Sequence, residues 1–174
     1  EIVLEEKIST VIYDNGREDS YLDTEGKIVE IIRKIGDDEW DRKTETVTTT
    51  NELGEEITEE KVLEQTHRPN IVSIIKEMGD YPIFYDTRDQ KIEINSKVID
   101  ANMVSGAIEW FNFINKNTDI PFGYIEIHNG IGDAVIRTRE GWHLLVKLDS
   151  PVKSQFEELE YTLKQKVSRE NLNY

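Results

Sequence analysis

The feature that most constrains the fold is an apolar stripe near the C-terminus. It recurs at spacings of four, three, four and four residues and comprises Val152, Phe156, Leu159, Leu163 and Val167. This spacing puts the five side chains on one face of a helix. Ser150 and Pro151 directly before it are typical of a helix start, since serine caps free amide groups and proline suits the first helical position. Such a helix needs an apolar surface beside it, so the rest of the chain has to supply one.

The residues before this helix have the pattern of strands. Ile120 to His128, Ala134 to Arg139 and Trp142 to Leu148 are rich in β-branched and aromatic residues, and the first ends in polar–apolar alternation. Glycine-containing turns separate them, at 129–133 and at 140–141. The last third therefore predicts three strands followed by a helix, and then an extended segment at 171–174.

The N-terminal part predicts a meander of strands. Ile2 to Ile8 and Ser9 to Tyr13 are two strand runs, and Asn15-Gly16 is a strong hairpin signal. The chain returns through Tyr21 to Asp23, turns at Gly26, and leaves through Lys27 to Ile32.

The middle of the chain predicts a second helix after a pair of strands. Ile83 to Tyr85 and Lys91 to Ile94 are expected to form the pair, and 97–99 a short extension. Asp100 is expected to cap a helix with the stripe Met103, Val104, Ala107, Ile108, Phe111 and Ile114. Asn70 to Met78 is a short apolar run whose type periodicity does not decide. The predicted fold class is α+β, with a mixed, mostly antiparallel sheet covered by two amphipathic helices.

An acidic segment, at about 36–64, interrupts this pattern. It holds eleven Asp and Glu residues against three Lys and Arg. Such charge runs are usually solvated loops, so we expect an insertion here, in which the threonine-rich Thr44 to Thr50 forms an edge strand.

Composition argues against several functional classes. The net charge of −15 disfavours nucleic acid, whose phosphates attract Lys and Arg. No run of eighteen apolar residues is present, as a membrane span would require. The absence of cysteine excludes disulfides, thiolate metal sites and a cysteine nucleophile.

Motifs for catalysis or cofactors are weak. The three histidines, His67, His128 and His143, lack metal-ligand spacing, and structural roles are favoured for them. Gly130-Ile131-Gly132 joins two strands and so is a hairpin turn instead of a dinucleotide fingerprint. Asp14 to Asp19 has calcium-like oxygens without the pattern of an EF-hand loop, which leaves a weak ion site open. We expect no cofactor, no metal site and no catalytic residues.

Several short motifs resemble the FtsQ/DivIB family of bacterial cell-division proteins. The C-terminal run from Arg137 through Gly141-Trp142 into the helix, and on to Asn173-Tyr174, is similar to the end of that family's β-domain. Asp23 to Gly26 resembles its D-x-x-G turn, and Tyr81 to Asp86 its L-P-x-I strand.

The resemblance implies a domain organisation and a function. Residues 1–8 would be the last strand of a preceding POTRA-like module, and 9–174 a β-domain truncated at its final strand. The protein would be a non-enzymatic scaffold at the division septum, on the extracytoplasmic face of the bacterial plasma membrane, with a membrane anchor upstream and no small-molecule substrate. FtsB- and FtsL-like proteins would bind by strand addition at the C-terminal sheet edge. The implied partner-binding residues are Leu172, Asn173 and Tyr174, with Lys164 and Glu160 on the helix beside them.

Two alternatives from other classes stay open. The first is a free-standing acidic domain whose segment 36–64 captures a basic partner. The second is a carboxylate-dependent hydrolase, which would need a cleft that holds two carboxyl groups with separated pKa values.

Overall fold

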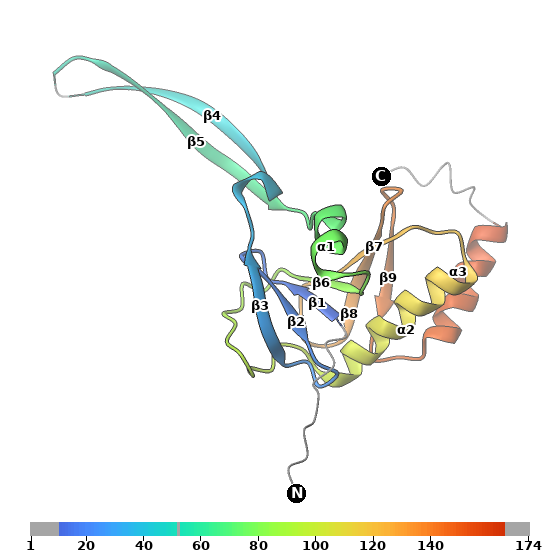
Figure 1. The fold of residues 1–174 in the computed structure, drawn as a ribbon. Coiled ribbons are helices and arrows are strands. Elements are labelled where there is room, and N and C mark those ends of the chain that lie inside the picture. The colour runs from blue at the N-terminus through green and yellow to red at the C-terminus, as the bar shows by residue number, and fades with distance from the viewer. Residues whose placement is uncertain (1–10, 52, 166–174) are drawn as a thin grey trace, which may run out of the picture.

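The computed structural model describes residues 11–51 and 53–165, and in it one seven-stranded sheet organises the chain. Its strands lie in the order β3-β2-β1-β6-β7-β8-β9. Their bounds are β1 Val11–Asp14, β2 Glu18–Leu22, β3 Ile28–Lys34, β6 Ile83–Asp86, β7 Phe122–Ile127, β8 Asp133–Thr138 and β9 His143–Lys147. Three α-helices, α1 Ile71–Met78, α2 Ala101–Asn117 and α3 Val152–Gln165, pack around it (Figure 1). The predicted α+β class is confirmed, but the described residues hold three α-helices, one more than expected.

Parallel pairing is confined to the middle of the sheet. β6 lies between β1 and β7 and is parallel to both. All other neighbours are antiparallel. The predicted mixed, mostly antiparallel sheet is therefore confirmed. Parallel neighbours need a crossover connection, and α2 provides it between β6 and β7.

The main core lies between one face of the sheet and the helices α2 and α3. The inward residues of α2 recur every three or four positions and include Met103, Val104, Ala107, Trp110 and Ile114. They meet alternate strand residues such as Phe84, Ile125 and Ile136, and the predicted α3 stripe joins the same cluster through Val152 and Phe156. Gly106 allows α2 to approach the chain after β9, because a Cβ there would lie 1.9 Å from the carbonyl oxygen of Leu148.

A smaller core lies on the opposite face of the sheet, under α1. The ambiguous run 70–78 is this helix, and Asn70 caps it by accepting a hydrogen bond from the amide of Ser73. Ile74 and Met78 of α1 pack on Ile12 and Ile83 of the central strands. The sheet is thus covered on both faces at its centre.

The expected strand at Lys91 to Ile94 is wrong. β6 already has a strand on each side, so no edge is free for a hairpin partner. The segment instead crosses the turn between β2 and β3, where the amides of Asn95 and Val98 donate to Ile28 and Gly26 at 2.8 and 2.9 Å. In this segment, β-type pairing is limited to the isolated antiparallel bridge between Lys27 and Lys97.

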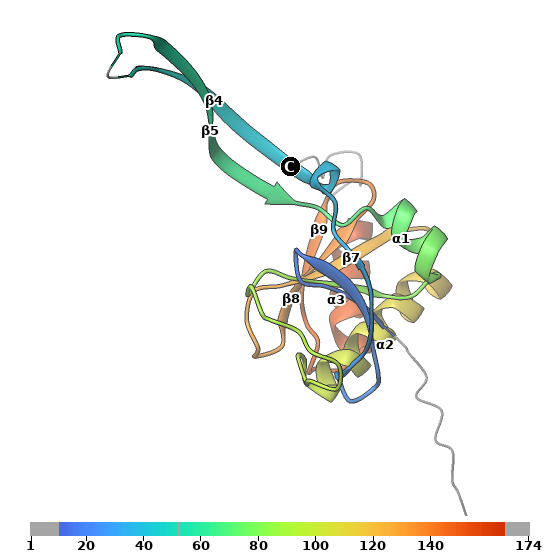
Figure 2. The ribbon, with the colours of Figure 1, turned by 60° about the vertical axis from the view of Figure 1, so that its left-hand side comes forward.

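The acidic segment forms a long hairpin that projects from the body. Its strands are β4 Trp40–Thr50 and β5 Glu56–His67, and they form a separate two-stranded sheet (Figures 1 and 2). We call residues 40–67 the arm. Threonine and other β-branched residues favour extended backbone, and opposite charges face each other at Glu45–Lys61 and Lys43–Glu64. The expected strand at 44–50 is thus part of β4, although the segment is far more ordered than a solvated loop.

Candidate functional site

The sheet ends on β9, which pairs with β8 alone among the described strands. The amide of Thr138 donates to Trp142, and that of Leu148 donates to Gly132. Because antiparallel ladders alternate, the intervening odd-numbered residues direct their backbone groups away from β8. These are His143, Leu145 and Lys147.

Most of this edge is open. At Lys147 the side chain of Gln155 from α3 occupies both backbone groups, since Gln155 Oε1 accepts from the amide and Nε2 donates to the carbonyl at 2.8 and 2.9 Å. Within 11–51 and 53–165, no group bonds to the outward backbone of His143 or Leu145. We call these two residues the open edge. Unpaired strand groups of this kind are templates for a further strand.

Apolar side chains border the open edge. Leu145 is 79% exposed, although it lies in a strand. It lines a hollow of about 390 Å³ at this edge of the sheet, together with His128, Asn129, Asp133, Ala134, Val135, Val146, Lys147 and Gln155. On the other face, Leu144 and the half-buried Leu159 and Leu163 of α3 pack against the main core. A strand added here would have apolar contacts available on both of its faces.

The structure places only part of the predicted site. Lys164 and Glu160 lie one turn apart on the exposed side of α3, and their side chains pair at 2.6 Å. Leu172, Asn173 and Tyr174 lie outside the described residues, as do residues 1–8 of the expected preceding module. The open edge was missed in the sequence, although the unbroken run Leu144-Leu145-Val146 departs from alternation and signals an apolar residue on the outer face.

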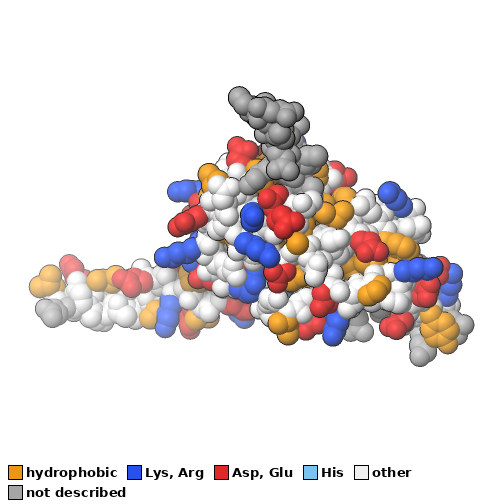
Figure 3. Space-filling view, turned by 90° about the horizontal axis from the view of Figure 1, so that it is seen from below, with side chains coloured by type: hydrophobic (Ala, Val, Ile, Leu, Met, Phe, Trp, Pro, Cys, Tyr) orange, Lys and Arg blue, Asp and Glu red, His pale blue; other side chains and the backbone are white. Residues whose placement is uncertain are grey.

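The arm is the second exposed surface. Its sequence carries eight Asp and Glu residues against three Lys and Arg. Leu53, Ile57, Val62 and Leu63 are between 41% and 84% exposed. Figure 3 shows acidic and hydrophobic side chains along the arm where it leaves the body.

A buried charge cluster lies where the arm joins the body. It consists of Asp14 on β1, Asp19 on β2, Arg33 on β3, Glu39 of the short 3₁₀ helix Asp37–Glu39, and His67 at the end of β5. We call these five residues the clamp. Asp14 and Asp19 are 0% exposed, His67 2% and Glu39 8%, so the cluster is largely buried, while the side chain of Arg33 is 21% exposed.

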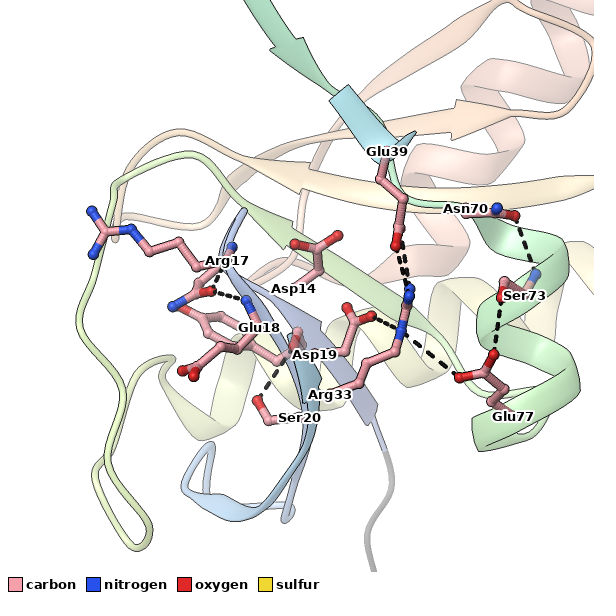
Figure 4. Close-up of polar contacts among 12 residues, drawn as sticks. Asp14, Arg17, Glu18, Asp19, Ser20, Arg33, Glu39, Asn70, Ser73 and Glu77 are labelled. Atoms are coloured by element: carbon pink, nitrogen blue, oxygen red, sulfur yellow. Dashed lines mark hydrogen bonds and ion pairs between the residues drawn. The ribbon is translucent and has the colours of Figure 1, made fainter. Parts of the chain in front are cut away.

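The contacts of the clamp are short and interlocked. Arg33 bonds both oxygens of Glu39 at 2.6 and 3.1 Å, and its Nε lies 2.7 Å from Asp19 Oδ2 (Figure 4). His67 Nε2 lies 2.6 Å from Asp14 Oδ2, and His67 Nδ1 lies 3.0 Å from the carbonyl oxygen of Glu39. Both ring nitrogens of His67 are occupied, so neither is available as a base.

Burial and charge shift the acid–base behaviour of the clamp. Burial, with the nearby charge of Asp14, raises the pKa of Asp19 to about 7. Burial also raises the pKa of Asp14. For His67, burial lowers the pKa, but the hydrogen bond and charge of Asp14 outweigh it and the pKa is raised. For Glu39, burial raises the pKa, but Arg33 outweighs it and the pKa is lowered.

Outside the clamp, the buried carboxylate of Asp86 is also fully engaged. It accepts from the hydroxyl of Tyr13 at 2.6 Å and from Nε and Nη2 of Arg88 at 2.8 and 2.6 Å. Burial, and then the bond to Asp86, raises the pKa of Tyr13. These three residues connect β1 to the loop after β6. Because the Asp86 carboxylate is bonded to Tyr13 and Arg88, we assign it a structural role.

A groove of about 710 Å³ opens at the root of the arm. It is lined by Trp40, Gln65, Thr66, His67, Arg68, Pro69, Ile71, Tyr85, Thr87, Tyr124, Glu126, Arg137, Thr138 and Gly141. The three carboxylates of the clamp are not in its wall. Its single carboxylate, Glu126, pairs with Arg137 at 2.7 Å, so this groove does not bring two carboxyl groups together.

Metal and membrane features are absent from the part of the chain that the structure describes. No three His, Asp or Glu residues there are arranged to hold a metal ion, and the loop at 14–19 is no exception. None of the described helices has the length and apolarity that crossing a membrane requires. Comparisons with protein-family models, with curated proteins and with solved structures find no match for this chain.

Proposed function

We propose that this domain is a binding scaffold that takes up a partner strand at the open edge of β9. The observation that carries the proposal is the pair of unpaired backbone positions, His143 and Leu145, beside an exposed leucine and an apolar hollow. Following the resemblance to the FtsQ/DivIB family, the partners would be FtsB- and FtsL-like division proteins. The site would act outside the cytoplasm at the division septum, without catalysis.

Backbone and side chains would contribute differently to such a complex. Hydrogen bonds to His143 and Leu145 would supply affinity for extended chain of any sequence. Specificity would come from alternate side chains of the partner, one set over Leu145 and the hollow, the other toward Leu144 and α3. The partner strand that fits best has apolar residues on both faces.

The test separates the backbone of Leu145 from its side chain. Leu145→Pro removes the outward amide, which an edge strand tolerates, whereas Leu145→Thr keeps the amide and removes the apolar contact. Binding of the FtsB- and FtsL-like segments encoded in the same genome is measured by calorimetry. We expect binding by the parent chain and at least about tenfold weaker binding by Leu145→Pro, since an interface hydrogen bond is lost.

The outcomes contradict different parts of the proposal. If neither segment binds the parent chain, the role in cell division is wrong. If Leu145→Pro binds as tightly as the parent, the partner does not use the open edge.

A second candidate function is capture of a basic partner by the arm. The observation that favours it is the net acidic charge on a hairpin exposed along its length. Attraction between exposed charges is screened by salt, with a Debye length of about 10 Å at 0.1 M. Binding that weakens steeply with salt and is lost when the arm is shortened would support this function, and binding that survives the shortening would exclude it.

A further inference from the structure

Both ends of the arm enter the body through the clamp. Glu39 immediately precedes the first arm residue, and Arg33 of β3 holds it. His67 is the last arm residue, and Asp14 of β1 holds it. The contact of His67 Nδ1 with the Glu39 carbonyl also ties the two ends to each other. Figure 4 shows Arg33 between Asp19 and Glu39 at this junction. The direction of the arm therefore depends on these contacts.

The charge of the clamp depends on two protons. Three carboxylates, those of Asp14, Asp19 and Glu39, face one permanent cation, Arg33. With protons on both Asp19 and His67 the cluster is neutral, and without them it carries two negative charges in a largely buried site. Uncompensated buried charge is costly, because the interior cannot solvate it as water does.

Neighbouring elements offset this charge only in part. The amide of Gly16 donates to Asp14 at 2.7 Å, and backbone hydrogen bonds from Gly36 and Asn70 lower the pKa of Glu39. On α1, Glu77 lies 4.0 Å from Arg33 and adds negative charge. On β6, Tyr85 packs edge-on against the ring of His67 at 5.0 Å between centroids. Asp19 also has no hydrogen bond to either carboxylate oxygen among the described residues, although its ion pair with Arg33 is short. The ionised form of Asp19 is therefore poorly stabilised where it stands.

We propose that the clamp is a proton-sensitive joint that holds the arm in one direction at mildly acidic pH and releases it at mildly alkaline pH. The geometry supports this reading because the titrating residues are the same ones that bind both ends of the arm. The proposal does not depend on which partner the open edge or the arm binds.

The sign follows from the directions of the pKa shifts. Asp19 has a pKa raised to about 7, above its value in an exposed site, and the pKa of His67 is raised as well. A group whose pKa is raised in the closed clamp stabilises it at low pH and loses that contribution as pH rises through the raised value. Between the ordinary pKa of an aspartate, about 4, and the raised pKa of about 7, each pH unit should therefore favour the open clamp by up to about tenfold through Asp19, and above that range this contribution is fully lost.

The absence of cysteine makes the motion measurable. Thr48→Cys on the arm and Lys116→Cys at the end of α2 are exposed positions for two spin labels in the full chain. Pulsed electron resonance then gives the distribution of distances between them. We expect one narrow population at about pH 5, and a displaced population whose ratio to it grows by up to about tenfold for each pH unit between about pH 5 and pH 7 and then levels off.

Two further substitutions test the residues involved. Asp19→Asn keeps the shape but removes the charge, and we expect the labelled protein to hold the narrow population up to about pH 8. Asp41→Asn is the matched control, since Asp41 is an exposed carboxylate at the arm root that pairs only with Arg68 at 3.7 Å. It should keep the full response. An unchanged distribution from pH 5 to pH 8 with the clamp intact overturns the proposal, whether or not Asp19→Asn folds well. An equal response in Asp19→Asn overturns it as well.

Discussion

The strands of the body and those of the arm are stabilised in different ways. Central strands of the body are covered on both faces, and side chains such as Ile12, Phe84 and Ile125 are fully buried. Arm strands have solvent on both faces, and among the described arm residues only His67 is buried. The arm instead depends on β-branched residues, cross-strand charge pairs and its anchored root. An isolated hairpin is marginally stable in water, so we infer that the clamp orders the arm as the core orders the body.

The largest effect is expected from the core of the body. Trp110→Ala should lower the free energy of unfolding by about 3–5 kcal/mol, because Trp110 is only 1% exposed at the centre of α2. Urea denaturation followed by circular dichroism measures this. Thr48→Ala, an exposed arm position, is the control and should change it by less than about 0.5 kcal/mol. Equal effects at the two positions would mean that the arm has a packed core of its own.

Glycine substitutions sharpen the same contrast. Alanine normally improves a helix interior, but Gly106→Ala should cost about 1–3 kcal/mol, because its Cβ would collide with the Leu148 carbonyl. Gly54→Ala at the arm tip meets nothing within 4 Å, and the cost there comes only from its φ of +82°. Denaturant midpoints should therefore move further for Gly106→Ala than for Gly54→Ala. A stabilised Gly106→Ala would show that α2 does not approach the β9–α3 connection closely.

Shortening the arm should hardly affect the body. Replacing 44–63 by Asn-Gly joins Lys43 to its partner Glu64 through a tight turn and keeps the clamp intact. We expect the free energy of unfolding of the body to change by less than about 1 kcal/mol, as for other surface changes. Calorimetric unfolding checks this. A large loss would mean that the body needs the distal arm for its own stability.

The smallest effect is expected on the exposed face of α3. Lys164→Ala breaks the ion pair with Glu160 and should cost only about 0.2–0.5 kcal/mol. Urea denaturation measures the change in the free energy of unfolding. Glu160→Ala is the matched substitution, because it removes the other partner of the same ion pair. If either substitution weakens binding of an FtsB-like segment tenfold at unchanged stability, these residues belong to the partner interface.

Local patterns in the sequence were informative where neighbours along the chain decide the structure. The Asn15-Gly16 hairpin, the helix that begins after Asp100, and the order of three strands and a helix at the C-terminus were all predicted and are confirmed. The strand predicted at Lys91 to Ile94 is not present. Its apolar alternation is compatible with a strand, but β6 has a neighbour on each side and no free edge with which it could pair. Availability of a partner is a property of the whole sheet.

The clamp shows the same limit for a site. In the sequence, Asp14 and Asp19 belong to a segment with calcium-like oxygens that leaves a weak ion site open, and His67 is one of three histidines for which structural roles are favoured. In the structure, Asp14 and His67 are 53 positions apart in sequence and bonded at 2.6 Å in a buried site. No local spacing in the sequence predicts the contact between Asp14 and His67. The contact depends on the parallel pairing of β1 with β6 and on the return of the arm to the body.

The sequence alone determined the class of the fold, because hydrophobic periodicity of two or of about 3.6 residues is a local property that selects strand or helix. It also determined that residues 36–64 would find no core, because they carry too little apolar surface and too much charge. Only the tertiary structure decided which strand ends the described sheet, that Leu145 is left with open backbone groups, and that the arm is held by buried charge. These features depend on contacts between distant segments, whose energies exist only once the chain has brought those segments together.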